Sequence, residues 1–288
     1  MPIARINTML FPEGKRRALT LSYDDGVLQD RRLVQMMNQC GVRGTFNLNS
    51  RILGRVEQMT LDGKTADIST VTPREIPVLY AGHEVATHGA EHSALTAYGS
   101  AGLLEVLDDR RVLEGLVPYM VQGHAYPFGL YDHHVLDGLR AAGIRYARTV
   151  VSTGTFEIPQ DFLRWDPTCH HNDPRLMELA ERFCQTDALF GQPQLFYLWG
   201  HAYEFDMDQN WQVIETFLHY VSRFQDKIWM ATNGEIERYV AAWRQMVFSA
   251  DGSRVYNPTA FTLWMESLGQ IYTIAPGETV CIKSTEAV

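Results

Sequence analysis

The chain has 288 residues, of which 45% are hydrophobic and 20% are charged, as expected for one large α/β domain or two smaller ones. Its formal net charge of −9 argues against nucleic acid or an anionic membrane as the main partner. The four cysteines are scattered without CxxC spacing, which favours reduced thiols. No apolar segment approaches ~20 residues, and no signal-peptide pattern opens the chain. We therefore expect a cytoplasmic protein; nothing in the sequence indicates its oligomeric state.

The first strong element is the apolar run 18–24, ALTLSYD, which predicts a buried strand. It ends in Asp24 and Asp25, and Gly26 allows a sharp turn there. Active sites of α/β folds lie at such strand ends. Because adjacent strand residues point to opposite faces, one carboxylate could hold a metal while the other takes a proton. The alternative is a turn with a helix cap, where Asp is also common.

Strands and helices then alternate to about residue 246. Further strands are predicted at 45–48, 82–87, 121–126, 146–151, 194–199 and 227–231, and helices at 28–40, 103–113, 132–142, 174–184, 211–221 and 235–245. Another short helix is expected to begin with a capping box at Thr72 and to stop before Pro77. Residues 49–71 and 152–173 are predicted to be loops.

The last part of the chain, 247–288, has short alternating runs broken by Gly and Pro, which predict a small β appendage. We therefore divide the chain into an N-terminal arm (1–17), a main domain (18–246) and this appendage. About seven strands alternating with helices favour an irregular (β/α) barrel over an open doubly wound sheet. No GxGxxG or Walker sequence opens a helix, so nucleotide binding has no support.

Polar features recur where predicted strands end, and in a barrel these ends converge on one rim. His88 and His92 are four residues apart, so on a helical turn both imidazoles can bind one ion. Two His and one Asp leave coordination positions open for water and substrate, as in catalytic zinc sites. His201 is a candidate general acid, although a capping histidine is the alternative. These features are Asp24 and Asp25, His88 and His92, the turn 127–129, and His201.

The motifs SYDDG, HGAEH, AYPFG, a segment containing WD, and LWGH follow one another in this order. In this respect residues 18–240 resemble the polysaccharide deacetylases, the NodB-homology enzymes of carbohydrate esterase family 4. The resemblance implies an α/β fold, a distorted (β/α)7 TIM-like barrel. It also implies a metal-dependent hydrolase that removes N- or O-linked acetyl groups from an acetylated sugar or polysaccharide.

The resemblance also implies roles for particular residues. Zinc is the expected ion, with cobalt or nickel as alternatives. The implied roles are catalytic base for Asp24, metal ligands for Asp25, His88 and His92, catalytic acid for His201, and oxyanion donor for the backbone N–H of Phe128.

Two motifs depart from the family pattern. The third is usually Arg-x-Pro-Tyr, whereas here 125–128 is AYPF, so the usual arginine partner of the base is missing and Arg164 is a candidate replacement. The fourth usually has Asp before Trp, whereas here Trp165 precedes Asp166. We expect Asp166 to orient His201.

Further polar and aromatic residues are candidates for the substrate groove. Tyr126, Trp165 and Trp199 could stack on sugar rings or could simply pack in the core. Glu204 is a candidate contact to substrate or to another residue of the site. The group 170–173, HHND, could line the groove, add to the metal site, or be a polar loop.

Two other functions stay open. One is a C–N hydrolase on the same scaffold that acts on a cyclic imide or ureide without a metal. The other is a non-catalytic carbohydrate-binding protein.

Overall fold

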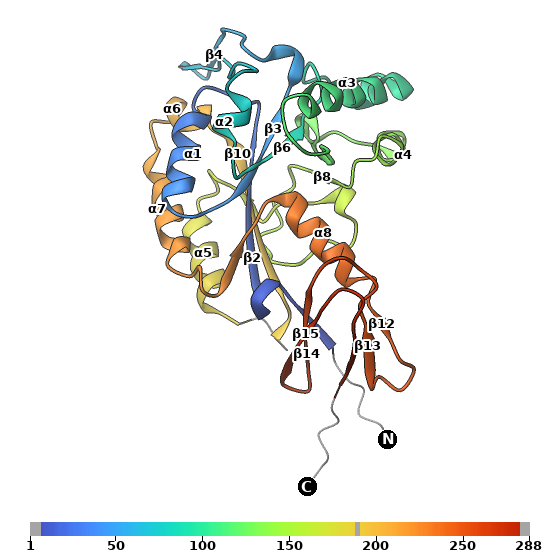
Figure 1. The fold of residues 1–288 in the computed structure, drawn as a ribbon. Coiled ribbons are helices and arrows are strands. Elements are labelled where there is room, and N and C mark those ends of the chain that lie inside the picture. Colours follow the sequence, from blue (N-terminus) through green and yellow to red (C-terminus); the bar gives the residue numbers. More distant parts are fainter. Residues whose placement is uncertain (1–6, 188–190, 283–288) are drawn as a thin grey trace.

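The computed structural model describes residues 7–187 and 191–282. Its centre is a parallel sheet in the order β8-β7-β6-β3-β2-β10-β9, with β11 also paired to β2. Strand β2 lies in the middle (Figure 1), which places its C-terminal end at the centre of the rim. The strands are β2 Arg17–Asp24, β3 Gly44–Leu48, β6 Glu84–Thr87, β7 Gly123–Ala125, β8 Tyr146–Arg148, β9 Cys169–His170, β10 Gln194–His201 and β11 Ile228–Met230.

The two edges of this sheet are joined by the segment around Trp165. The Trp165 N–H donates to the Ala147 carbonyl oxygen at 3.0 Å, and the Thr168 N–H donates to that of Tyr197 at 2.8 Å. The segment therefore links β8 to β10 and curves the sheet round. The predicted fold class is confirmed: the seven strands from β8 to β9 form an irregular parallel barrel.

Strands β2 and β10 are paired along their whole lengths, from Arg17 opposite Gln194 to Asp24 opposite His201. Both strands are almost entirely buried, because helices cover the outer face of the sheet and side chains fill the inside of the barrel. This register places two predicted catalytic residues side by side at the strand ends.

The helices cover the outside of the barrel. In Figure 1, α1, α5 and α7 lie along one side, and α3 and α4 on the other. Buried side chains such as Leu33, Phe183 and Phe217 connect the first group of helices to the sheet in one core. The helices are α1 Asp30–Gln39, α2 Ile76–Leu79, α3 Gly102–Glu114, α4 His133–Ala141, α5 Leu176–Gln185, α6 Tyr203–Met207, α7 Gln212–Ser222 and α8 Asn233–Trp243.

Three local expectations were wrong. Helix α2 begins at Ile76 and contains Pro77 in its first turn, where proline is tolerated, while Thr72 and Glu75 form a hydrogen-bonded turn before it. Within the expected loop 49–71 lies an antiparallel hairpin of β4 Gln58–Leu61 and β5 Lys64–Asp67. The second expected loop, 152–173, contains β9.

The C-terminal region contains two three-stranded antiparallel sheets, β1-β14-β15 and β12-β13-β16. Strand β1 (Asn7–Leu10) comes from the predicted N-terminal arm and pairs with β14. These strands lie at the opposite end of the barrel from β4 (Figure 1). The other strands are β12 Val247–Phe248, β13 Arg254–Tyr256, β14 Leu263–Ser267, β15 Gln270–Ile274 and β16 Thr279–Cys281.

The proposed domain boundaries remain a prediction, and residues 1–6 of the arm and 283–288 of the appendage lie outside the described residues. Among the helices that the structure describes, none has the length and hydropathy needed to cross a membrane.

Candidate active site

Asp24, at the end of β2, is a buried carboxylate with strong partners. Asn47 Nδ2 donates to its Oδ1 at 2.7 Å, and the Arg148 guanidinium donates to its Oδ2. Burial alone would raise the pKa of Asp24, but the positive charges of Arg148, His88 and His201 lower it to about 2. Asp24 is therefore ionised at neutral pH, as a general base must be.

Arg148 supplies the cation that the third motif lacks. It stands at the end of β8, is 1% exposed, and its guanidinium lies 4.3 Å from the centre of the Trp199 ring. The expected replacement, Arg164, is exposed instead and lies 3.9 Å from Asp161. Arg148 could have been found from the sequence, since it lies inside the predicted strand 146–151.

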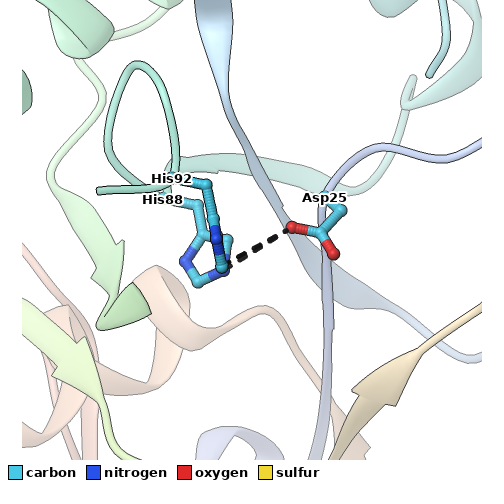
Figure 2. Close-up of side chains that lie close together, drawn as sticks. All are labelled: Asp25, His88 and His92. Carbon is cyan, nitrogen blue, oxygen red and sulfur yellow. Dashed lines mark ion pairs between the residues drawn. The ribbon is translucent and has the colours of Figure 1, made fainter. Parts of the chain in front are cut away.

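Asp25, His88 and His92 converge as expected. The Nε2 atoms of His88 and His92 lie 3.8 and 4.0 Å from Asp25 Oδ1, respectively, and Figure 2 shows both imidazoles facing this carboxylate. His88 Nδ1 lies 2.8 Å from the carbonyl oxygen of Ala125. A proton on Nδ1 donates to that carbonyl and leaves Nε2 free to bind an ion.

The backbone and the electrostatics of this trio favour a divalent ion. Asp25 and His92 adopt positive φ values of 75° and 57°, a strain that is often found at functional sites. Burial, together with the charge of His88, lowers the pKa of His92, which favours the neutral imidazole that metals bind. Two imidazole nitrogens and one carboxylate oxygen fit a zinc-type ion.

His201, at the end of β10, faces the same carboxylate as Arg148. Its Nε2 lies 3.8 Å from Asp24 Oδ2, and its Nδ1 lies 3.2 Å from Glu204 Oε1. Burial lowers the pKa of His201, but the bond to Glu204 and the charges of Asp25 and Asp24 outweigh it and raise this pKa to about 9. His201 is therefore protonated at neutral pH and can act as an acid.

Glu204, and not Asp166, holds His201. Asp166 is exposed and accepts a hydrogen bond from the Thr149 hydroxyl; with Arg164 and Trp165 it lines a different pocket. Glu204 follows His201 by three residues, in the short helix α6. The two residues lie on either side of the turn from β10 into α6, so their short separation in the sequence was the available signal for the pair.

The remaining predicted residues differ in their accessibility. Phe128 is 62% exposed and its ring lies 4.6 Å from that of His92. Tyr126 is buried and donates to the Leu163 carbonyl oxygen at 2.7 Å. Trp165 is 1% exposed and packs in the core, so it is not available to a sugar.

The candidate catalytic and metal-binding residues line one cavity of about 630 Å³. This volume is typical of small-ligand sites. The cavity is lined by Asp24, Asp25, His88, His92 and His201, and by the aromatic side chains Tyr126, Phe128, Trp199 and Tyr203. Further lining comes from the segment that contains the β4–β5 hairpin, with Arg55, Glu57, Met59, Ile68 and Thr70.

Comparisons with known proteins indicate a family and a fold. Residues 12–147 match the family model described as polysaccharide deacetylase. A search of curated protein sequences gives no match.

Among solved structures, the chain is similar to a putative polysaccharide deacetylase from Mycobacterium smegmatis (18% identity, 85% of this chain and 96% of that chain, TM-score 0.59). It is also similar to a CE4 family pseudoenzyme, BA3943, from Bacillus anthracis (14% identity, 80% of this chain and 68% of that chain, TM-score 0.51). At these identities the likeness shows a shared fold. The family match supports the resemblance seen in the motifs over residues 12–147, and with it the assignment of the chain as a hydrolase of the polysaccharide deacetylase type.

Proposed function

We propose that this protein is a metal-dependent deacetylase that hydrolyses an N- or O-linked acetyl group on an acetylated sugar or polysaccharide. One observation carries the proposal: a buried, ionised Asp24 and a protonated His201 lie 3.8 Å apart beside the Asp25–His88–His92 trio. Neighbouring groups whose pKa values are driven in opposite directions mark an acid and a base.

The trio would hold a divalent ion, most simply zinc, with cobalt or nickel as alternatives. When bound there, such an ion polarises an acyl carbonyl and makes water more acidic.

The chain's own residues would move the protons. Asp24 takes a proton from the attacking water, while Asn47 and Arg148 keep its carboxylate in place. His201 Nε2–H, held from the other side of the ring by Glu204, gives a proton to the leaving nitrogen or oxygen. The backbone N–H of Phe128, at the cavity wall, is proposed as a donor to the developing oxyanion.

The cavity suits a carbohydrate. Its aromatic lining offers faces on which sugar rings can stack, and Arg55 and Glu57 in the same lining offer polar contacts to hydroxyl groups. We therefore propose an acetylated sugar unit as the group bound in the cavity.

An acetate-release screen tests the activity. The substrates are N-acetylglucosamine oligomers, peptidoglycan fragments and O-acetylated xylan. We expect zinc-loaded protein to release acetate from at least one of them, and Asp24→Asn and His201→Ala each to abolish turnover while zinc stays bound to the trio. His88→Ala should lose zinc from the trio. Wild-type activity in either catalytic variant would refute the assignment.

The same experiment separates the alternatives. A trio that binds no metal, in a protein that hydrolyses a cyclic imide or ureide, would identify the metal-free C–N hydrolase. Binding of acetylated sugars without acetate release would identify a carbohydrate-binding protein.

A further inference from the structure

A second cluster of two histidines and one carboxylate lies behind His201. His170 ends β9, His171 follows it, and Glu204 lies in α6. Glu204 Oε2 lies 3.0 Å from His171 Nε2 and 3.2 Å from His170 Nε2. The donor atoms are of the same kinds as those of Asp25, His88 and His92.

His171 is the most buried member of this cluster. It is 0% exposed, and among the described residues its Nδ1 has no hydrogen-bond partner. Its Nε2 faces Glu204 Oε2 at 3.0 Å, and within the described part of the chain neither of these two atoms makes a well-aligned hydrogen bond. A cation between them would give both buried atoms a ligand bond.

The imidazole of His171 is held in a fixed orientation. It stacks on Phe205 with ring centres 4.1 Å apart and on Tyr23 at 5.7 Å. On its Nδ1 side lies Gly200, where a Cβ atom would come within 2.0 Å of Nδ1. The absence of a side chain at position 200 therefore allows His171 to direct Nε2 at Glu204.

The distances fit one small ion. Donors about 2.0–2.2 Å from zinc, at angles between a right angle and a tetrahedral angle, lie about 3.0–3.4 Å apart. The measured separations of 3.0 and 3.2 Å fall within this range. The side chains of His170 and Glu204 are 22% and 21% exposed, so an ion and a water ligand can reach the cluster from solvent.

We propose that His170, His171 and Glu204 form a second site for a divalent ion of the zinc class. Imidazole nitrogens favour zinc, cobalt or nickel over magnesium and calcium, which prefer oxygen ligands. The site goes beyond the proposed deacetylase function and does not depend on it. Because Glu204 offers Oε2 to the ion and Oε1 to His201, the ion would also fix the carboxylate that positions His201.

Metal content tests the proposal without an activity assay. The full chain is loaded with excess Zn²⁺, dialysed and analysed for zinc by mass spectrometry. We expect two equivalents in the wild type, one in His88→Ala/His92→Ala, and one in His170→Ala/His171→Ala. Cobalt added to His88→Ala/His92→Ala should give the visible absorption of a cobalt–imidazole complex, which His170→Ala/His171→Ala should abolish in that background.

An exposed histidine pair provides the matched control. His133 and His134 are adjacent on α4, with ring centres 3.8 Å apart, and His133→Ala/His134→Ala should retain both equivalents. Because His171 is buried, His170→Ala alone serves as a second variant that should still fold; it should weaken the second site about tenfold or more. The proposal is refuted if His88→Ala/His92→Ala binds no zinc, or if the second equivalent survives in His170→Ala/His171→Ala. Neither result bears on acetate release, which tests the function separately.

Discussion

The pair of Asp24 and Arg148 is the most consequential contact at the scale of single residues. Both side chains are 1% exposed, so neither charge can be solvated if the other is removed. Breaking a buried pair of this kind costs about 3–5 kcal/mol. The same contact lowers the pKa of the proposed base, so stability and pH dependence should change together.

Replacing Arg148 by methionine tests this link. Because the guanidinium lowers the pKa of Asp24, its loss should raise that pKa and move the acid limb of the pH–rate profile up by about 1–3 pH units. Arg148→Met should also lose about 3–5 kcal/mol in urea unfolding, and Arg148→Lys should recover part of both losses. The control is Arg164→Met at an exposed arginine; an equal effect there would disprove the assignment to Arg148.

The variant Glu204→Gln tests the proposed role of His201 as the catalytic acid. A histidine must be protonated to donate, so activity falls as pH rises through its pKa, which is raised to about 9 in His201. The amide removes the negative charge that raises this pKa, so the alkaline limb should move down by about 1–3 pH units. Asp166→Asn, at the residue first expected to orient His201, should leave the alkaline limb in place. A limb that does not move in Glu204→Gln would exclude Glu204 as the partner of His201.

The sequence was sufficient to locate site residues that stand at the ends of predicted strands. It was not sufficient to locate the side chains that contact them. Asp24, Asp25, His88 and His201 follow predicted strands, and the structure brings them into one cavity. The partners of Asp24 and His201 depend on which strands and turns meet in space. Asp166 was assigned by analogy to a motif whose two residues stand in reverse order here, and the structure places it elsewhere.

At the scale of elements, the Tyr146 side chain of β8 can lie against β7 only because residue 123 is glycine. Gly123 pairs with Tyr146, and a Cβ atom at 123 would lie 2.0 Å from the Tyr146 hydroxyl oxygen. Arg148 belongs to the same strand as Tyr146. The packing of β8 therefore positions the cation that holds Asp24.

Gly123→Ala should destabilise the fold by about 1–3 kcal/mol, because Tyr146 must move. The measurement is the urea midpoint at constant m-value. Gly138→Ala on α4 is the control: its nearest side chain is Leu103 at 3.9 Å, and alanine in a helix should add about 0.5–1 kcal/mol. Equal stability of the two variants would contradict the packing argument.

Long apolar elements were predictable and short polar ones were not. Strand β10 is eight residues long and largely buried, and the sequence places it within two residues. By contrast, the β4–β5 hairpin is mostly exposed and polar, and β9 has two residues. Such elements are held by tertiary pairing, which leaves no periodic pattern of apolar residues.

At the scale of the whole molecule, the two ends of the chain are joined on the side of the barrel remote from the β4–β5 hairpin. Strand β1 pairs with β14, and the Tyr239 hydroxyl of α8 connects both: it donates to the Leu10 carbonyl oxygen at 2.6 Å and accepts from the Trp264 N–H at 3.1 Å. Tyr239 is buried. The Tyr239 hydroxyl therefore ties the predicted arm and appendage to α8, in addition to the apolar core that the three share.

Tyr239→Phe should cost about 1–3 kcal/mol in urea unfolding, because the Leu10 and Trp264 groups lose this partner. Bound zinc and acetate release should stay unchanged, since the cavity lies elsewhere. Tyr256→Phe on β13, where the ring is 40% exposed, should stay within about 0.5 kcal/mol of the wild type. Loss of zinc in Tyr239→Phe would show that the two ends of the molecule are coupled.

The pairing of Asp24 with His201 across β2 and β10 has a consequence for how the substrate of such a protein can change. Backbone hydrogen bonds keep neighbouring strands about 4.7–4.9 Å apart, so the spacing of the proposed base and acid is a property of the sheet and not of any loop. Every substrate would have to place its scissile bond between Asp24 and His201, whose separation stays the same. New substrates would therefore be accommodated by exchanging the hairpin and turns around the rim, while the proposed proton-transfer pair stays unchanged.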